Sequence, residues 1–330
     1  MKIAICILLA ISLTGCSQSE YQTRSLPLLG TIINCKTFDS RDSKEAIDQA
    51  IDRMKALEDV FDRFRPTSEV RRVNKVAGER AFDVTKDFFQ LLDQSLYLSA
   101  VTGGAFDVTV GPLVEAWGFY SKKKFELPSK KVISRALEAV GYRHVILDPE
   151  ILSVKFDVHG VELDFNAIAK GYIVDEAARV LKKNGVEVAL IDAGGDVLCI
   201  GRRNDKEWIL GIRHPINKKR VIARMSLSGG AAATSGGYEN YITIDGKKFP
   251  HILDPRTGYP PEHNVLSATV VCKSLAMADA LATALFVMEP DEGLDLIESL
   301  DNIDCVIIAI ENDNIKFFIS EGIKDSVEIL

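Results

Sequence analysis

The sequence predicts an α+β fold in which two lobes share one buried core. Its 330 residues are 47% apolar and 26% charged. This composition is typical of a soluble globular protein, and the length suits one large domain or two moderate ones. Runs of adjacent strand-like segments are mixed with helical stretches, which favours α+β over a repeated βαβ pattern. Because no long Gly- or Pro-rich linker divides the chain, we expect the lobes, with a boundary near residue 160, to pack together.

The first residues predict a lipoprotein signal. A positive start at Lys2 precedes an apolar run over residues 3–13, which is too short to span a bilayer and is typical of a signal segment. The run leads into the sequence LTGC, which resembles the bacterial lipobox, so Cys16 is expected to be acylated. We therefore predict a signal peptide over 1–15, a tether over 16–26, a folded domain over 27–330, and lipid anchoring on the periplasmic side of a bacterial membrane. The alternative is an ordinary secretory signal that contains Cys16.

Charge and cysteine usage exclude some classes of protein. The formal net charge of -7 argues against a general basic surface for nucleic acid, so binding of a phosphorylated ligand needs local positive charge or a metal ion. Beyond Cys6 in the signal and Cys16, four cysteines lie in apolar, strand-like runs without C-x-x-C spacing, and are expected to be small buried hydrophobes: Cys35, Cys199, Cys272 and Cys305. The alternative is one disulfide, whose pairing the sequence does not fix.

Hydrophobic periodicity predicts the order of the elements. In the first half we expect, from the spacing of apolar residues, a strand over 26–35, a long amphipathic helix over 43–64, helices over 87–101 and 133–140, and strands over 145–147, 152–158 and 161–165. In the second half we expect a helix over 167–183, strands over 188–191, 208–213, 221–227 and 267–271, an apolar helix over 276–288, a helix over 292–300, and strands over 305–310 and 315–319.

Common catalytic signatures are missing from the sequence. It contains no P-loop, no H-E-x-x-H and no G-x-S-x-G. The five histidines are scattered, which argues against a His-rich zinc site. Any chemistry must therefore come from less familiar segments.

Two segments join glycines or helix starts to polar side chains. Gly103 and Gly104 precede Asp107, which could accept hydrogen bonds from a ligand; the alternative is a helix end followed by a structural turn. Further on, Asp164 and Asn166 come just before a predicted helix whose first turn carries Lys170. A lysine there could meet an anion near the helix terminus, and the alternative is a capped helix with a solvated lysine.

Three further segments combine glycines, carboxylates and one histidine. The sequence DAGGD at 192–196 follows a buried strand, and the small residues at 228–238 leave room for a flat or phosphorylated ligand, unless they form a flexible loop. His251 could act as an acid or base, although a lone histidine is more often structural.

A further segment with polar side chains lies on the apolar helix over 276–288. Asp279 and Thr283 are four residues apart and share one face. A buried, unpaired carboxylate is costly, and a hard cation relieves that cost. Carboxylate and hydroxyl oxygens suit Mg²⁺, which completes its shell with water and phosphate oxygens. The alternative is an Asp279 that is hydrogen-bonded within the core.

Taken in order, these segments carry a family resemblance. The matching residues are Gly30-Thr31, Arg65-Pro66 with Ser68-Glu69 and Asn74, the run 104–113, the run 164–172, the run 192–196, Thr234-Ser235-Gly236, the run 251–258 and the run 278–284. Together they cover about residues 29–288 and resemble the FAD:protein FMN transferase family, the ApbE type. The resemblance implies an ApbE-like, T-fold-related fold of two-lobed mixed sheets with packed helices.

The resemblance also implies roles for particular residues. It implies FAD contacts from Leu29 (where the family usually has Met), Phe64, Ala105, Phe106, Asp107, Asp164, Lys170 and Ile252. It implies a Mg²⁺ site formed by Asp279, Thr283 and the backbone carbonyl of Ala167. It assigns catalysis to His251 and Asp279.

The activity implied by the resemblance is transfer of FMN from FAD to a Thr or Ser of a partner protein, with release of AMP. Expected acceptors are flavoprotein subunits of membrane redox complexes, and no nucleic acid partner is expected. One alternative is a Mg²⁺-dependent FAD pyrophosphatase that gives FMN and AMP. The other is a flavin-binding lipoprotein that does no chemistry.

Overall fold

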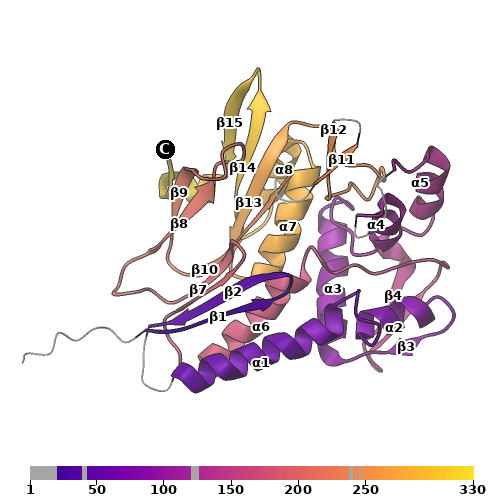
Figure 1. Cartoon of the computed structure of the whole chain (residues 1–330), viewed down its shortest axis with the longest axis horizontal. Helices are drawn as coiled ribbons and strands as arrows, with labels where there is room; N and C mark the ends of the chain where they lie inside the picture. Colours follow the sequence, from indigo (N-terminus) through magenta and orange to yellow (C-terminus); the bar gives the residue numbers. More distant parts are fainter. Residues whose placement is uncertain (1–20, 39–42, 120–125, 238–240, 245–246) are drawn as a thin grey trace, which may run out of the picture.

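A large antiparallel sheet forms the centre of the molecule (Figure 1). The computed structural model describes residues 21–38, 43–119, 126–237, 241–244 and 247–330, so the predicted signal and Cys16 lie outside it. In spatial order the strands are β1 (Gln22–Leu28), β2 (Thr31–Thr37), β6 (Ala189–Ala193), β7 (Asp196–Ile200), β10 (Gly230–Gly236), β13 (Val265–Cys272), β14 (Asp304–Glu311) and β15 (Asn314–Ile319).

The two faces of this sheet are covered by different layers. On one face pack α1 (Ser43–Phe61), α6 (Ala169–Lys183) and α7 (Leu275–Val287). On the other packs a three-stranded sheet of β8 (Trp208–Arg213), β9 (Val221–Leu227) and β16 (Val327–Ile329). Strand β10 divides its side chains accordingly, because successive residues point to opposite faces: Ala231 and Ala233 join the core with the helices, and Ala232 joins the core with β8 and β9.

A second group of elements follows α1 and packs beside the helices. It contains α2 (Glu69–Val76), α3 (Lys86–Val101), α4 (Gly111–Trp117), α5 (Lys130–Leu137), η1 (Tyr142–His144) and the small sheet of β3 (Phe82–Asp83), β5 (Ser153–Phe156) and β4 (Val145–Asp148). Ser68, Thr85 and Ser129 begin α2, α3 and α5, because each side-chain oxygen accepts a backbone N–H of the first turn. The apolar core continues from α6 into this group through Phe61, Phe88 and Phe165.

Four further elements lie in the second half of the described chain. They are β11 (Tyr241–Ile244) paired with β12 (Lys247–Pro250), α8 (Pro290–Glu298) and η2 (Glu321–Ser326). A boundary near residue 160 would place β1 and β2 in a different lobe from the other strands of the large sheet. In the structure these strands form one sheet, and one core spans both halves of the chain.

The structure departs from several of the predicted elements. The expected strand over 26–35 is a hairpin, since Leu29 and Gly30 turn the chain with φ of 55° and 69°. Residues 22–26, expected in the tether, belong to β1. The stretch 161–165 makes one bridge, from Glu162 to Val110, and is not a strand. The run 228–238, for which a flexible loop was the alternative, provides β10 through residue 236. Helices α2 and α4 and strand β7 were not expected.

The four cysteines beyond Cys16 are buried free thiols, as the small-hydrophobe interpretation predicted. Burial raises the pKa of Cys35, Cys199 and Cys305 to about 12. Across the described part of the chain, none of the helices has the length and apolar character needed to cross a membrane.

Candidate active site

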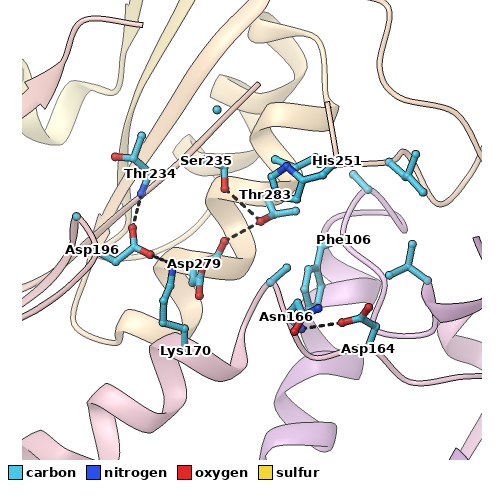
Figure 2. Close-up of a pocket in the computed structure, with 18 of the residues that line it drawn as sticks. Phe106, Asp164, Asn166, Lys170, Asp196, Thr234, Ser235, His251, Asp279 and Thr283 are labelled. Atoms are coloured by element: carbon cyan, nitrogen blue, oxygen red, sulfur yellow. Dashed lines mark hydrogen bonds and ion pairs between the residues drawn. The ribbon is translucent and has the colours of Figure 1, made fainter. Parts of the chain in front are cut away.

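One cavity collects most of the predicted site residues. It has a volume of about 330 Å³ and lies where the loop before α4, the start of α6, the β6–β7 turn, β10 and α7 meet. Figure 2 shows Asp279 and Thr283 of α7 between two groups of side chains, with Lys170, Asp196 and Thr234 on one side and Phe106, Asp164 and Asn166 on the other.

Helix α7 places an acidic oxygen in the cavity without a protein partner. Asp279 is only 6% exposed, and its Oδ2 accepts no hydrogen bond from the described residues. Burial raises the pKa of Asp279 to about 7; the Lys170 ammonium opposes this rise and the Asp196 carboxylate adds to it. One turn later, the Thr283 hydroxyl donates to the Asp279 carbonyl oxygen (3.2 Å) and lies 3.2 Å from Ser235 Oγ. The Asp279 carboxylate also accepts the Gly171 backbone N–H, so the alternative of an Asp279 that is hydrogen-bonded within the core holds in part and leaves Oδ2 unaccounted for among the described residues.

These donors fit a hard divalent cation. Among the described residues, no group of three or more His, Cys, Asp or Glu gathers at one point, so a zinc-like site is not formed by them. The cavity offers Asp279 Oδ2, which accepts no hydrogen bond from the described residues, and the Thr283 hydroxyl one turn away. Ala167 also lines the cavity. Oxygen donors that leave places for water and phosphate are the set that Mg²⁺ prefers.

Lys170 is an ion-paired residue, and the solvated alternative is wrong. Its ammonium pairs with Asp196, which is 4% exposed and also accepts the Thr234 backbone N–H at 3.0 Å. This pair connects the first turn of α6 to the point where β10 extends past β7. It places one positive charge within the field of Asp279.

Gly171 explains how α6 comes so close to α7. A Cβ there would lie 2.4 Å from the Leu275 carbonyl oxygen and 2.5 Å from the Ala276 nitrogen. The absence of a side chain therefore lets the Lys170 turn approach the helix that carries Asp279.

Asp164 serves the loop and a buried arginine and does not cap α6. The helix begins after Ile168, which makes no side-chain cap hydrogen bond, so the alternative of a helix capped by Asp164 and Asn166 is wrong. Instead Asp164 accepts the Asn166 backbone N–H (2.9 Å) and forms an ion pair with Arg63. Arg63 is 4% exposed and also contacts Glu115 at 2.8 Å. Although burial lowers the pKa of Arg63, these carboxylates raise it above its usual value.

Asp107 holds the backbone of its own loop. Its Oδ1 accepts the Thr109 N–H (2.8 Å) and hydroxyl (2.6 Å), and its Oδ2 accepts the Tyr142 N–H (2.8 Å). Asp107 therefore organises its own turn, as the alternative predicted, but it also lines the cavity, so its contact with a ligand stays a prediction; burial raises its pKa. Ala105 and Phe106, beside it, line the cavity.

The remaining predicted residues divide into two sets. His251 and Ile252 line the cavity, just before a turn in which Asp254 pairs with Arg256 at 2.9 Å. Leu29 and Phe64 do not line it: Leu29 is in the β1–β2 turn, where its N–H donates to Glu58, and Phe64 is 55% exposed.

A sequence neighbour of Leu29 and one of Phe64 nevertheless contact residues that line the cavity. Thr31 follows the turn that contains Leu29 and packs closely against Gly194, which lines the cavity. Phe64 follows Arg63, which pairs with Asp164.

Comparison with known proteins identifies the family. A family model described as the ApbE family matches residues 29–307. This chain belongs to the ApbE family. An FAD:protein FMN transferase from Vibrio cholerae is 33% identical over 322 residues, covering 94% of this chain and 95% of that protein. One from Klebsiella pneumoniae is 33% identical over 300 residues, covering 90% and 92%.

The ApbE fold is also found in solved structures similar to this chain. The crystal structure of the ApbE protein from Thermotoga maritima has a TM-score of 0.84 at 31% identity, covering 92% of this chain and 98% of that one. The flavin transferase ApbE from Vibrio cholerae has a TM-score of 0.83 at 28% identity, covering 93% and 99%. The predicted α+β, ApbE-like fold is confirmed.

Sequence reasoning missed several residues of this ApbE cavity. Arg63, which does not line the cavity but pairs with the lining residue Asp164, was not singled out, and Asp196 was noted only as part of a glycine-rich turn. Gly211 and Arg213 of β8 also line the cavity and were not singled out in the sequence. Charge clustering near residue 213 was the one available signal for β8.

Proposed function

We propose that this chain transfers FMN from FAD to a Thr or Ser hydroxyl of a partner protein, with Mg²⁺ bound at Asp279. The observation that carries the proposal is the buried Asp279 carboxylate, whose Oδ2 has no hydrogen-bond donor among the described residues, one helical turn from the Thr283 hydroxyl. Family membership supports the same reaction, because the relatives from Vibrio cholerae and Klebsiella pneumoniae are named FAD:protein FMN transferases.

The residues of the cavity divide the work in this proposal. Asp279, Thr283 and the Ala167 carbonyl would hold the ion, which supplies charge neutralisation on the diphosphate and on the leaving AMP. Lys170 adds a fixed positive charge at the same end of α6. Ala105, Phe106 and Ile252 provide apolar wall for the ring systems of FAD. Asp164 would accept a hydrogen bond from FAD through the lone pairs that its ion pair with Arg63 leaves free.

The reaction balances without a further reactant. The acceptor hydroxyl oxygen attacks the phosphorus on the riboflavin side, a new P–O bond forms, and the bond from that phosphorus to the bridging oxygen breaks. AMP leaves with that oxygen, and FMN remains as a phosphoester on the acceptor. His251, on the cavity wall, would take the hydroxyl proton.

The proposal is tested by mass spectrometry of a candidate acceptor incubated with enzyme, FAD and Mg²⁺. We expect the acceptor to gain the mass of one FMN less one water and AMP to appear in equal amount, and both to be lost in Asp279→Ala. Free FMN with an unmodified acceptor would instead identify an FAD pyrophosphatase. FAD that remains intact would identify a flavin-binding protein without this chemistry.

We further propose that Cys16 is lipidated and holds the enzyme on the periplasmic side of a bacterial membrane, near flavoprotein subunits of redox complexes. The support is the apolar run and the LTGC sequence that ends at Cys16. Radiolabelled palmitate should enter the wild-type chain and not Cys16→Ser, which should move to the soluble fraction. Equal labelling of both would refute the anchor.

A further inference from the structure

The segment 202–224 is basic in an acidic chain. It has eight basic residues against Asp205 and Glu207, while the whole chain carries a formal charge of -7. The basic residues are Arg202, Arg203, Lys206, Arg213, Lys218, Lys219, Arg220 and Arg224. They lie on β8, β9, the loop before β8 and the loop between the two strands. We refer to residues 202–224 as the basic hairpin.

The basic hairpin begins at the wall of the cavity. Gly211 and Arg213 of β8 line it together with Asp196 and Thr234. The loop over 214–220 leaves from the Arg213 end of β8, and in it Lys219 and Arg220 are exposed. Arg213, on the cavity wall, therefore connects the positive surface of the hairpin to the cavity.

Strand β8 also has an available edge. It lies at the end of the order β16-β9-β8 and pairs with β9 alone among the described strands. The backbone groups of such an edge can hydrogen-bond an added extended segment. Ile209 on β8 is 62% exposed and Ile216 in the following loop is 66% exposed. The hairpin thus offers backbone, apolar and positively charged contacts together.

We propose that the basic hairpin docks an acidic, extended segment of the acceptor protein, which lies along the edge of β8 and brings its hydroxyl residue past Arg213 into the cavity. This inference rests on the proposed transfer reaction, because only a transferase needs a second, protein substrate at the cavity. The rest of the chain is net negative and repels an acidic partner, so a positive mouth both orients the partner and speeds its arrival.

Protection against aggregation and binding of lipid both fit the basic hairpin less well. Charged residues on an edge strand prevent aggregation, but that role does not require one sign of charge or a place on the cavity wall. Anionic lipid headgroups also attract basic segments. Lipid binding, however, uses the charge alone, whereas docking of an acceptor also uses the place of Arg213 on the cavity wall.

The test compares two fluorescent synthetic peptides, each with a single Thr in an extended sequence. One has Asp and Glu around the Thr, and the other has Asn and Gln at the same places. We expect the wild-type enzyme to prefer the acidic peptide, with a preference that weakens as salt is added. Lys219→Glu/Arg220→Glu should bind the acidic peptide about tenfold more weakly and the amide peptide as before.

A matched control changes the same number of charges elsewhere. Lys130→Glu/Lys131→Glu alters the exposed first turn of α5, on the opposite side of the molecule from β8 and β9 (Figure 1), where acidic residues suit the helix dipole. This variant should keep the wild-type preference. An equal loss in both variants, or a preference unchanged in Lys219→Glu/Arg220→Glu, would overturn the proposal.

Further measurements separate the remaining outcomes. If Lys219→Glu/Arg220→Glu loses FAD affinity, the hairpin serves FAD and the proposal fails. If it loses only binding to phosphatidylglycerol vesicles, the surface is for lipid and the proposal fails. If the acidic peptide binds as expected but neither it nor a protein acceptor gains FMN, the docking surface stands and the transfer reaction is what fails.

Discussion

Asp279 is a carboxylate that the folded chain holds at a cost. Its raised pKa, about 7, arises first from burial, so the charged form is disfavoured in the fold. An acid whose pKa is raised on folding adds stability below its unfolded value and loses that stability as the pH rises through the folded value. The metal-free protein should therefore lose stability between about pH 4 and pH 7 through this group.

Asp279→Asn removes that charge and should stabilise the metal-free protein. At about pH 8 in chelator, the free energy of unfolding should rise by roughly 2 kcal/mol. Added Mg²⁺ should raise the melting temperature of the wild type and leave that of the variant unchanged. Thermal unfolding followed by circular dichroism measures both effects. A variant that Mg²⁺ stabilises as much as the wild type would place the ion elsewhere.

The Lys170–Asp196 pair gives a second prediction at this scale. In Lys170→Met, Asp196 keeps its Thr234 contact but loses its counter-charge beside Asp279. Because the lysine side chain is 30% exposed, we expect a modest loss of about 1–2 kcal/mol in unfolding free energy. Lys170→Arg should recover most of it. Urea unfolding of the three proteins decides, and a Met variant as stable as the wild type would show that water replaces the pair.

The sequence predicts some residues of the site but not all of their contacts. Asp279 and Thr283 could be predicted because a carboxylate within an oily helix is conspicuous in the sequence. The partner of Asp164 could not be predicted, because Arg63 lies 101 positions away and meets it only through the tertiary fold. Asp107 was a mixed case: its two donors from Thr109 are local, as the spacing had suggested, whereas its third donor, the Tyr142 N–H, comes from 35 positions away.

At the scale of elements, long periodic segments were predicted well and small-residue segments were not. Helices α1, α3, α6 and α7 fall close to the ranges expected from apolar spacing. Strand β10 did not, because Gly230–Gly236 consists of Gly, Ala, Thr and Ser and lacks the bulky β-branched residues that usually signal a strand. Its small side chains are explained only by the close packing of α7, which no local pattern contains.

The approach of α6 to α7 can be tested at Gly171. Alanine usually stabilises a helix interior relative to glycine by about 1 kcal/mol. Here the sign should reverse: the new methyl would meet the backbone at Leu275, so Gly171→Ala should cost about 2 kcal/mol and weaken Mg²⁺ binding. Gly293→Ala in α8 is the control, since its methyl meets the tips of Leu285 and Ile307 and should cost less. Calorimetric unfolding compares the two.

At the scale of the whole molecule, one apolar core joins the helices of the large sheet to the helices around α3. The cavity lies over this joint, so its walls come from residues between 105 and 283. Their order along the chain was recognisable in the sequence, but their convergence depends on the topology. The same holds for charge. The formal net charge and the basic residues of 202–224 can be read from the sequence, whereas their place beside the cavity depends on the fold.

The buried thiols report on the integrity of this core. Cys35, Cys199, Cys272 and Cys305 lie in β2, β7, β13 and β14, and burial raises the pKa of each. Because the thiolate is the reactive form, iodoacetamide should label none of them in the native protein at neutral pH. All four should become labelled together across the denaturant transition, as counted by intact mass. Early labelling of Cys35 alone would indicate that the β1–β2 edge opens separately.

The start of β1 at Gln22 has a geometric consequence for the anchored enzyme. Only residues 17–21 separate it from the proposed lipid on Cys16, and an extended chain advances about 3.5 Å per residue, giving a leash of roughly 17 Å. With Cys16 lipidated as proposed, the folded body would be held within this distance of the membrane surface. Acceptor proteins whose target hydroxyl lies far from the bilayer would then be out of reach. The distance of this hydroxyl from the membrane would therefore limit which acceptors the enzyme can modify.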